Sequence, residues 1–101
     1  MNITVIIWLQ KIAEKIERKH NLSKDEVEQT FINDPYYRFL EKGKINGENV
    51  YAIYGRADSG RYLTVIFIRK FDNQALIITA RDMDRKERKQ YEKQNNRRDS
   101  R

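Results

Sequence analysis

The sequence predicts an α+β domain: two early helices pack on one face of a curved antiparallel sheet of four strands, or five if the first segment joins it, and a third helix follows. Two observations predict this class. A helical period of apolar residues in the first third of the chain changes at Tyr36 to the alternating period of strands. The segments between the later strands are short, which favours antiparallel neighbours. The expected element order is β-α-α-β-β-β-β-α.

The N-terminal third is expected to hold a short edge strand and two helices. Ile3 to Trp8 is an apolar run rich in β-branched residues, which favours an extended segment. Leu9 to Lys19 has apolar residues at helical spacing and charged residues between them, and Asn21 suits the left-handed position that ends a helix. Ser23 and Glu26 have the spacing of a capping box, so a second helix begins almost at once.

The rest of the chain is expected to form strands and one last helix. Asp34-Pro35 ends the second helix, because proline restricts the residue before it to extended conformations. Four strands are expected at residues 36–41, 48–54, 61–71 and 75–80. Asp84, followed three residues later by Glu87, is a second capping box and predicts a basic helix that runs to about Asn95.

Length and charge indicate one basic domain. The 101 residues fit a single domain over residues 1–95, followed by a disordered basic tail over residues 96–101. Twenty-one basic and 15 acidic residues give a net charge of +6. From Arg81 onward there are nine basic and five acidic residues, so most of the excess lies at the C-terminal end. Such an end suits a phosphate-rich partner or an acidic protein, and composition does not choose between them.

Composition also argues against several classes of function. The absence of cysteine removes disulfides, thiolate chemistry and zinc ribbons, and it fits a reducing cytoplasm. A single histidine cannot build a multi-histidine metal site, and we expect no metal and no cofactor. The apolar opening is short and has no basic segment before it, so we expect no signal peptide and no contact with a membrane.

Two residues are the first candidates for a catalytic role, each with a structural alternative. Arg81 lies where the last strand ends, and its guanidinium could hold a phosphate with two hydrogen bonds. A salt bridge to Asp82 or Asp84 is an equally good interpretation of Arg81. His20 is the only side chain whose ordinary pKa lies near neutrality, which suits proton transfer. A histidine at a helix end is also favoured simply by the helix dipole.

The last helix supplies further candidates. Arg88 and Tyr91 are three residues apart and share a helix face. Tyr91 could stack on a base or donate its hydroxyl, or it could only pack the helix onto the sheet. Tyrosines recur along the strands, and basic residues among aromatic ones suit single-stranded nucleic acid. The expected supporting RNA contacts are Lys19, Arg61, Arg69, Arg85 and Lys89.

With these residues placed, the chain resembles the BrnT family of toxins from bacterial type II toxin-antitoxin systems. Lys19-His20, twelve residues after Trp8, is similar to the Lys-His-Gly ending of the family's first helix. Three further segments resemble, in this order, the opening of the family's second helix, the end of that helix and the central strand: Leu-Ser-Lys-Asp-Glu, Phe-Ile-Asn-Asp-Pro and Gly-Arg-Tyr-Leu. Ile-Thr-Ala-Arg followed by Glu-Arg-Lys-Gln-Tyr is close to its ending. The chain departs from the family at Leu9, Ile16 and Asn21, where an acidic residue, asparagine and glycine are usual.

The resemblance implies a RelE-like endoribonuclease fold and RNA cleavage in the cytoplasm without the ribosome. It also implies an antitoxin with a ribbon-helix-helix domain, which covers the site in a hetero-oligomer. The expected chemistry is metal-independent attack of a ribose 2'-hydroxyl on the adjacent phosphate, with His20, Arg81, Arg88 and Tyr91 as catalytic residues. The alternative is a catalytically silent module that uses the same basic surface to bind nucleic acid or protein.

Overall fold

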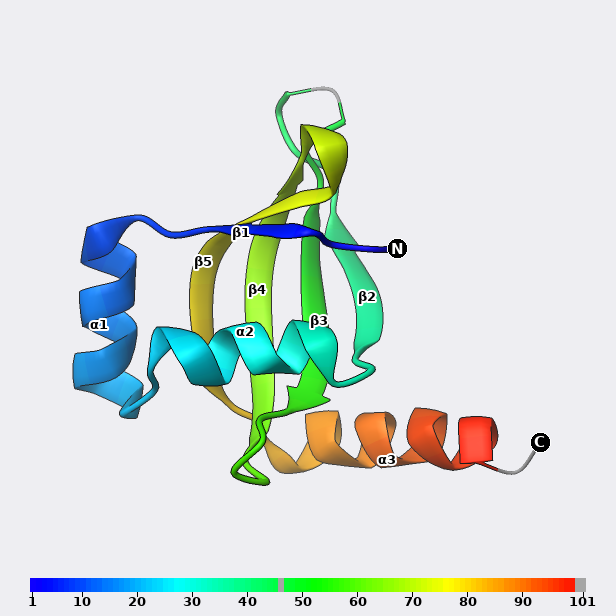
Figure 1. The fold of residues 1–101 in the computed structure, drawn as a ribbon. Coiled ribbons are helices and arrows are strands. Elements are labelled where there is room, and N and C mark those ends of the chain that lie inside the picture. The colour runs from blue at the N-terminus through cyan, green and yellow to red at the C-terminus, as the bar shows by residue number, and fades with distance from the viewer. Residues whose placement is uncertain (46, 100–101) are drawn as a thin grey trace.

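The computed structural model describes residues 1–45 and 47–99, which form one five-stranded sheet and three α-helices (Figure 1). The helices are α1 (Gln10–His20), α2 (Lys24–Ile32) and α3 (Arg85–Asp99). The strands are β1 (Val5–Ile7), β2 (Tyr36–Glu41), β3 (Val50–Arg56), β4 (Tyr62–Lys70) and β5 (Gln74–Asp82). A short 3-10 turn, Phe71–Asn73, joins β4 to β5. The predicted α+β class and element order are confirmed.

The sheet has the order β1-β5-β4-β3-β2, and one pairing differs from the prediction. Strands β2 to β5 are antiparallel neighbours, as their short links predict. β1 is parallel to β5, with Val5 opposite Gln74, so the sheet is mixed and the expectation of a wholly antiparallel sheet is wrong. The reason is the path of the chain. After β1, helices α1 and α2 lead to β2 at the opposite edge of the sheet. The chain then crosses the sheet in four strands of alternating direction, and the last of them, β5, runs beside β1 in the same direction as β1.

Local signals fix the helix boundaries. Asn21 ends α1 in the left-handed conformation, at φ 52°. The Ser23 hydroxyl accepts a hydrogen bond from the Glu26 amide, and Glu26 accepts one from the Ser23 amide, which confirms the capping box of α2. The same exchange occurs between Asp84 and Glu87 at the start of α3, at 2.8 and 2.9 Å. Both boxes were predicted from spacing alone.

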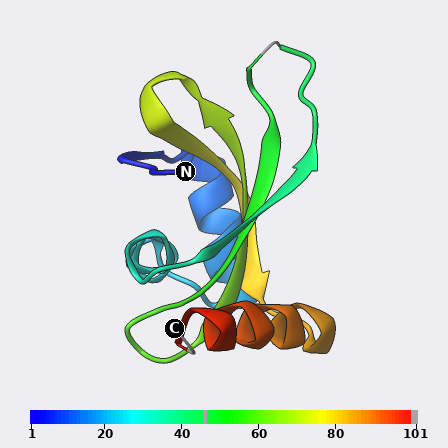
Figure 2. The ribbon, with the colours of Figure 1, turned by 90° about the vertical axis from the view of Figure 1, so that its right-hand side faces the viewer.

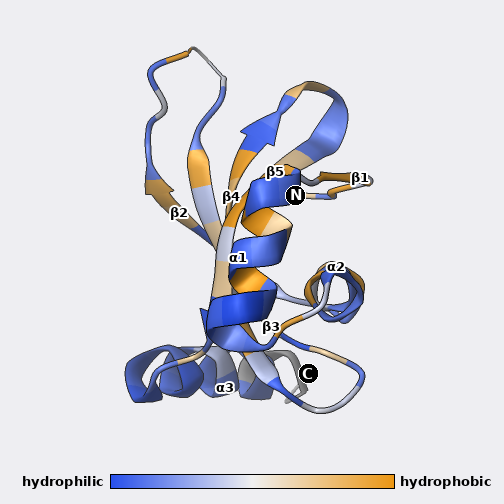
Figure 3. Cartoon of the chain, turned by 90° about the vertical axis from the view of Figure 1, so that its left-hand side faces the viewer, coloured by the Kyte–Doolittle hydropathy of each residue, from blue (hydrophilic) through white to orange (hydrophobic). Residues whose placement is uncertain are grey.

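Helix α3 runs to Asp99, beyond the predicted end near Asn95. Between Arg85 and Asp99 it contains neither proline nor glycine, and its many Arg, Lys, Gln and Glu residues propagate a helix well. Residues 96–99, which were expected to lie in a disordered tail, belong to this helix, and residues 100 and 101 lie outside those described. Figure 3 shows α3 as almost entirely hydrophilic, whereas α1 has an apolar stripe. Among the residues that the structure describes, no helix is long and apolar enough to cross a membrane.

Alternate residues of a strand face opposite sides of the sheet. Figure 2 shows α1 and α2 on one side of the sheet and α3 across its lower end. We call the side covered by α1 and α2 the helix face, where the main core lies and side chains such as Phe67 and Ile53 are fully buried. We call the other side the site face. Of the described helices, α3 alone packs there, over a small cluster that contains Ala52, Tyr54 and Tyr91. The helix face is an apolar core, and the site face is where polar side chains emerge from the sheet.

Candidate active site

Arg81 lies on the site face, near the end of β5 and opposite Thr64 in the ladder with β4. Its guanidinium makes a two-pronged pair with the Glu87 carboxylate, at 2.6 Å from Nη1 and 2.7 Å from Nη2. Nη1 also donates to the Asp82 carbonyl at 3.2 Å. The hydrogen bonds from Arg81 to Glu87 are the main reason that the pKa of Arg81 is raised above its ordinary value. Arg81 is thus held in a fixed orientation by a carboxylate that the sequence did not suggest as its partner.

Glu87 is the centre of this network. Besides Arg81, it accepts hydrogen bonds from the Asp84 amide at 2.9 Å and from the Thr64 hydroxyl at 3.1 Å. Burial tends to raise the pKa of Glu87, but these donors outweigh it, so the pKa is lowered from its ordinary value of 4.5. Glu87 is therefore ionised at neutral pH. It joins β4, β5 and α3 at one point.

A cavity of about 350 Å³ opens beside this network. Its lining combines charged and hydrogen-bonding groups, from Arg38, Tyr54, Asp84, Lys86, Glu87 and Gln90. Arg38 donates from Nη1 to the hydroxyl oxygen of Tyr54 at 3.0 Å, and this bond is the main cause of the raised pKa of Arg38. Because arginine can only donate, the Tyr54 hydroxyl keeps its own proton for another acceptor. Two cations, a hydroxyl and two carboxylates therefore surround one space.

Arg38, Tyr54, Lys86 and Glu87 were not among the predicted site residues. Tyr54 lies opposite Tyr36 in the β2–β3 ladder, which brings Arg38, two residues along β2, within reach of its hydroxyl. The alternating period showed that both strands form, but not which residues face each other. Among residues 1–45 and 47–99, no three histidine or acidic side chains are placed to hold a metal ion.

Arg88 and Tyr91 meet at Tyr62 rather than in the cavity. The Arg88 guanidinium carbon lies 3.8 Å from the centre of the Tyr62 ring. Tyr91 is 5% exposed and packs edge-to-face on the same ring, with centroids 5.9 Å apart. This contact corresponds to the packing alternative for Tyr91. Arg88 and Tyr91 do share a helix face, as their spacing predicted, but that face does not line the cavity.

His20 lies at the end of α1, whose core contacts are on the helix face. Its carbonyl and that of Asn21 each accept a hydrogen bond from Arg61 at 2.8 Å. Arg61 also pairs with the Asp82 carboxylate at 2.9 Å, which is the main reason that its pKa is raised. Arg61 thus ties the end of α1 to the end of β5. Lys19 is exposed on the same last turn. The structure does not bring the His20 side chain to the residues that line the cavity.

The remaining predicted RNA contacts lie apart from one another. Arg69 is at the other end of the sheet, where Nη2 donates to the Asn73 side chain at 3.1 Å. Its Nε is buried and has no hydrogen-bond partner among the described residues. Arg85 and Lys89 are exposed on α3. Of the predicted set, Arg85 and Lys89 share α3 with the cavity residue Lys86, whereas Arg69 is distant.

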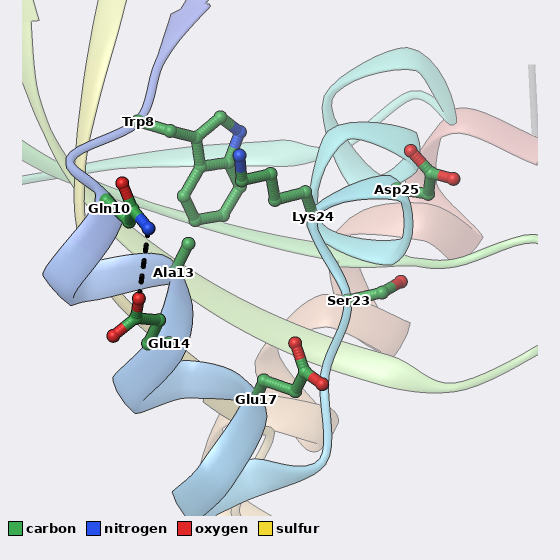
Figure 4. A pocket seen from close by; sticks show the side chains of 8 residues that line it. All are labelled: Trp8, Gln10, Ala13, Glu14, Glu17, Ser23, Lys24 and Asp25. Carbon is green, nitrogen blue, oxygen red and sulfur yellow. Dashed lines mark hydrogen bonds between the residues drawn. The ribbon is translucent and has the colours of Figure 1, made fainter.

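A larger cavity, of about 770 Å³, lies on the helix face between α1 and α2 (Figure 4). Trp8 forms one wall, and Glu14, Glu17 and Asp25 are among its lining residues. The Trp8 indole donates to Glu28 at 2.7 Å. Several carboxylates repel phosphate, so this cavity is chemically unsuited to the backbone of a nucleic acid. The smaller cavity on the site face has two cations, Arg38 and Lys86, beside its carboxylates.

The structure is a small basic α+β domain that presents arginine and tyrosine side chains from one sheet face, a character typical of proteins with phosphate-rich partners. A family model described as "Ribonuclease toxin, BrnT, of type II toxin-antitoxin system" matches residues 8–87. The chain belongs to this family, and the predicted resemblance is confirmed. Membership implies an RNA substrate and an antitoxin partner.

Comparison with solved structures supports the fold. The crystal structure of the Brucella abortus ribonuclease toxin BrnT is similar to this chain with a TM-score of 0.55. The two sequences are 15% identical, and the match covers 81% of this chain and 100% of that one. At this identity the likeness speaks for the fold alone. Comparison with curated protein sequences gave no match.

Proposed function

We propose that this chain cleaves RNA without a metal ion, by attack of a ribose 2'-hydroxyl on the adjacent phosphate. The observation that carries the proposal is the cavity on the site face, where Arg38, Lys86 and Tyr54 surround a space beside the fixed guanidinium of Arg81. Cleavage of this kind needs a base that takes the proton of the attacking 2'-hydroxyl, cations for the charge that develops on the phosphoryl oxygens, and a group that gives a proton to the leaving 5'-oxygen. The lining supplies the cations and the proton donor, and its Asp84 carboxylate can accept the hydroxyl proton.

Arg81 is the proposed phosphate clamp. Its three hydrogen bonds, to Glu87 and to the Asp82 carbonyl, leave the Nε hydrogen and a second Nη2 hydrogen available for a phosphate. A guanidinium that is already oriented loses little entropy when the substrate binds. Glu87 acts in this arrangement as a positioning residue. The cost is that its negative charge partly offsets the positive charge of Arg81.

For proton transfer, the geometry favours Tyr54 over His20. The Tyr54 hydroxyl lines the cavity and accepts from Arg38, so its own proton can pass to a leaving oxygen there. Arg38, beside it, can neutralise the phenolate that this transfer forms. His20 remains the group predicted from the sequence for this step. Arg88 and Tyr91 remain predicted contributors, on the part of α3 that faces Tyr62.

The proposed partner is an antitoxin with a ribbon-helix-helix domain, which binds the toxin in a hetero-oligomer in the cytoplasm. β2 is an edge strand of the sheet, and it exposes Phe39 and Leu40 beside Ile45 in the following loop. Such an edge carries unpaired backbone groups and apolar side chains, which a partner chain can cover. Type II family membership supports the presence of a partner, and the edge supports a place for it.

A catalytically silent binding module is the second candidate. The close pair between Arg81 and Glu87 favours it, because a guanidinium already paired with a carboxylate attracts phosphate less strongly. Such a module would bind RNA with a steep salt dependence and leave it intact.

The test is incubation of the purified chain with a defined RNA in excess chelator, with mapping of the new ends. Arg81→Ala and His20→Ala run in parallel, with Arg18→Ala as a matched control because Arg18 is exposed on α1 and outside the cavity lining. We expect discrete ends bearing a 2',3'-cyclic phosphate from the wild type and from Arg18→Ala, and few from Arg81→Ala. Intact RNA at concentrations where binding is shown would instead support the silent module. Cleavage only when a divalent metal is supplied would contradict metal independence.

A further inference from the structure

A second basic cluster lies on the site face, around the ring of Tyr62. Arg56 and Tyr62 are directly opposite each other in the β3–β4 ladder, and the Arg56 guanidinium carbon lies 4.5 Å from the ring centre. Arg88, from α3, lies 3.8 Å from the same ring centre. Tyr91 packs against the ring edge-to-face. One tyrosine, held by α3, therefore brings together two arginines that are far apart in the sequence.

The two cations of this cluster are poorly neutralised. The Arg56 guanidinium donates to the Gly60 carbonyl, a neutral acceptor, at 3.3 and 3.4 Å. Gly60 has a φ of 94°, which a glycine adopts without strain in the turn between β3 and β4. Within the described part of the chain, the one carboxylate paired with Arg88 is the exposed Glu92 at 4.0 Å. Arg61 and Arg81, by contrast, have carboxylates at 2.9 Å or less. The cluster therefore keeps an excess of positive charge.

Cation–π contact explains how two like charges can share this place. A guanidinium is attracted to the face of a tyrosine ring, and this attraction offsets part of the repulsion between the two arginines. An anion offsets the rest, and a phosphodiester matches the N–H edges of a guanidinium. A nucleic acid base is a less suitable ligand, because two guanidiniums and the Tyr91 ring already contact Tyr62.

The cluster is separate from the catalytic cavity. Lys86 and Gln90 line the cavity, and they are four residues apart on one side of α3. Arg88 and Glu92 are also four apart, but two residues further along a helix means roughly 200° of rotation. The two basic sites therefore lie on different sides of the same helix. An RNA strand bound in the cavity must leave it across the adjoining protein surface.

We propose that Arg56, Tyr62 and Arg88 form a phosphate subsite for single-stranded RNA, which holds the backbone at a nucleotide flanking the cleaved one. Arg56 and Arg88 bind the phosphate, and Tyr62 is the platform that positions them. This inference rests on the proposed function, since both sites take the same substrate. Because the ligand is backbone rather than base, the subsite adds affinity without sequence preference.

The test measures binding independently of cleavage. The probe is a fluorescently labelled RNA oligonucleotide with 2'-O-methyl groups throughout, which lacks the nucleophile and stays intact. The dissociation constant is measured between 50 and 200 mM salt for the full chain, for Arg56→Gln, Arg88→Gln and their double variant, and for Arg18→Gln as a charge-matched control. The logarithm of the association constant decreases linearly with the logarithm of the salt concentration. We expect this slope to become less steep by about 0.7 for each RNA phosphate that a variant no longer neutralises, in uridine-rich and adenine-rich probes alike. Arg18→Gln should keep the wild-type slope.

Equal slopes for the cluster variants and for Arg18→Gln would overturn the subsite, as would an absence of salt-dependent binding by the wild type. A weakening of binding confined to one base composition would also overturn it, since it would indicate base recognition. The proposed function fails differently: if natural RNA stays intact while the cluster variants still show reduced slopes, the subsite stands and the ribonuclease mechanism does not. Circular dichroism of each variant checks that it is folded.

Discussion

The two faces of the sheet are built from alternating residues of the same strands, yet they have opposite characters. On β4, Val65 and Phe67 face α1 and α2 and are fully buried among apolar side chains. Thr64, between Leu63 and Val65, is equally buried, but on the site face its hydroxyl donates to Glu87. Adjacent residues thus meet either an apolar layer or a charged network. The difference teaches that the alternation of residues along a strand separates the apolar core from the charged network of the site face.

The largest effect is expected on the helix face. Phe67 is fully buried and contacts the rings of Phe31 and Tyr51, with centroids at 5.3 and 5.9 Å. Phe67→Ala should lower the free energy of unfolding by about 3–5 kcal/mol, because it removes buried surface and leaves a cavity. Chemical denaturation measures this change. Its neighbour Ile66 is only partly buried on the site face, so Ile66→Ala should lower the free energy of unfolding by less. Equal losses of free energy for the two variants would contradict the conclusion that the helix face holds the main core.

The next effect is expected on the site face, in rate rather than in stability. Arg81→Ala should slow RNA cleavage by about 10²–10³-fold, the usual cost of removing one positioned donor for the charge that develops. Single-turnover cleavage with saturating protein measures this change, with Arg18→Ala as the control. If Arg81→Ala stays folded and cleaves within a few-fold of the wild type, the Arg81–Glu87 pair is structural only.

A third prediction separates the two candidates for proton transfer. Tyr54→Phe removes only a hydroxyl from the cavity and should slow cleavage by about 10²-fold, the lower end for a proton-transfer group. His20→Ala, at the end of α1, should stay within a few-fold of the wild type. The same single-turnover assay compares the two variants. If His20→Ala slows cleavage strongly and Tyr54→Phe does not, His20 is the proton-transfer group and the Tyr54 side chain serves only in packing.

These assignments show which parts of the structure a sequence can predict. Both capping boxes, at Ser23 and at Asp84, were predicted because three-residue spacing brings the partners together whatever the rest of the chain does. The parallel pairing of Val5 with Gln74 was not predicted, because it depends on the path of the whole chain between them. Local hydrogen bonds can be predicted from spacing, whereas long-range pairing requires the assembled sheet.

The candidate site was predicted only in part, for the same reason. Arg81 was identified from its place at a strand end, but the sequence suggested Asp82 or Asp84 as its carboxylate and the structure has Glu87. The predicted capping box already placed Glu87 at the start of α3, so that choice could have been made. The contact between Arg38 and Tyr54 could not, since it depends on the register of β2 against β3.

The smallest expected effect concerns the stability of the site face and its dependence on pH. The donors around Glu87 lower its folded-state pKa below the ordinary value of 4.5, so folding favours the ionised carboxylate. This contribution is fully present above pH 4.5 and is lost as the pH falls through the lower folded-state pKa. Glu87→Gln should therefore cost about 1–2 kcal/mol at neutral pH, where charge-assisted hydrogen bonds to Arg81 are weakened.

The measurement is the unfolding free energy of both proteins from about pH 7 to about pH 3, with Glu92→Gln as a control because Glu92 is exposed and paired only at 4.0 Å. The gap between the wild type and Glu87→Gln should narrow below pH 4.5, while Glu92→Gln stays near the wild type throughout. A gap that is constant with pH would mean that Glu87 stabilises the site face by shape and packing rather than by charge. Packing would then stabilise the site face as it stabilises the helix face, and the two faces would differ only in the side chains that line the cavity.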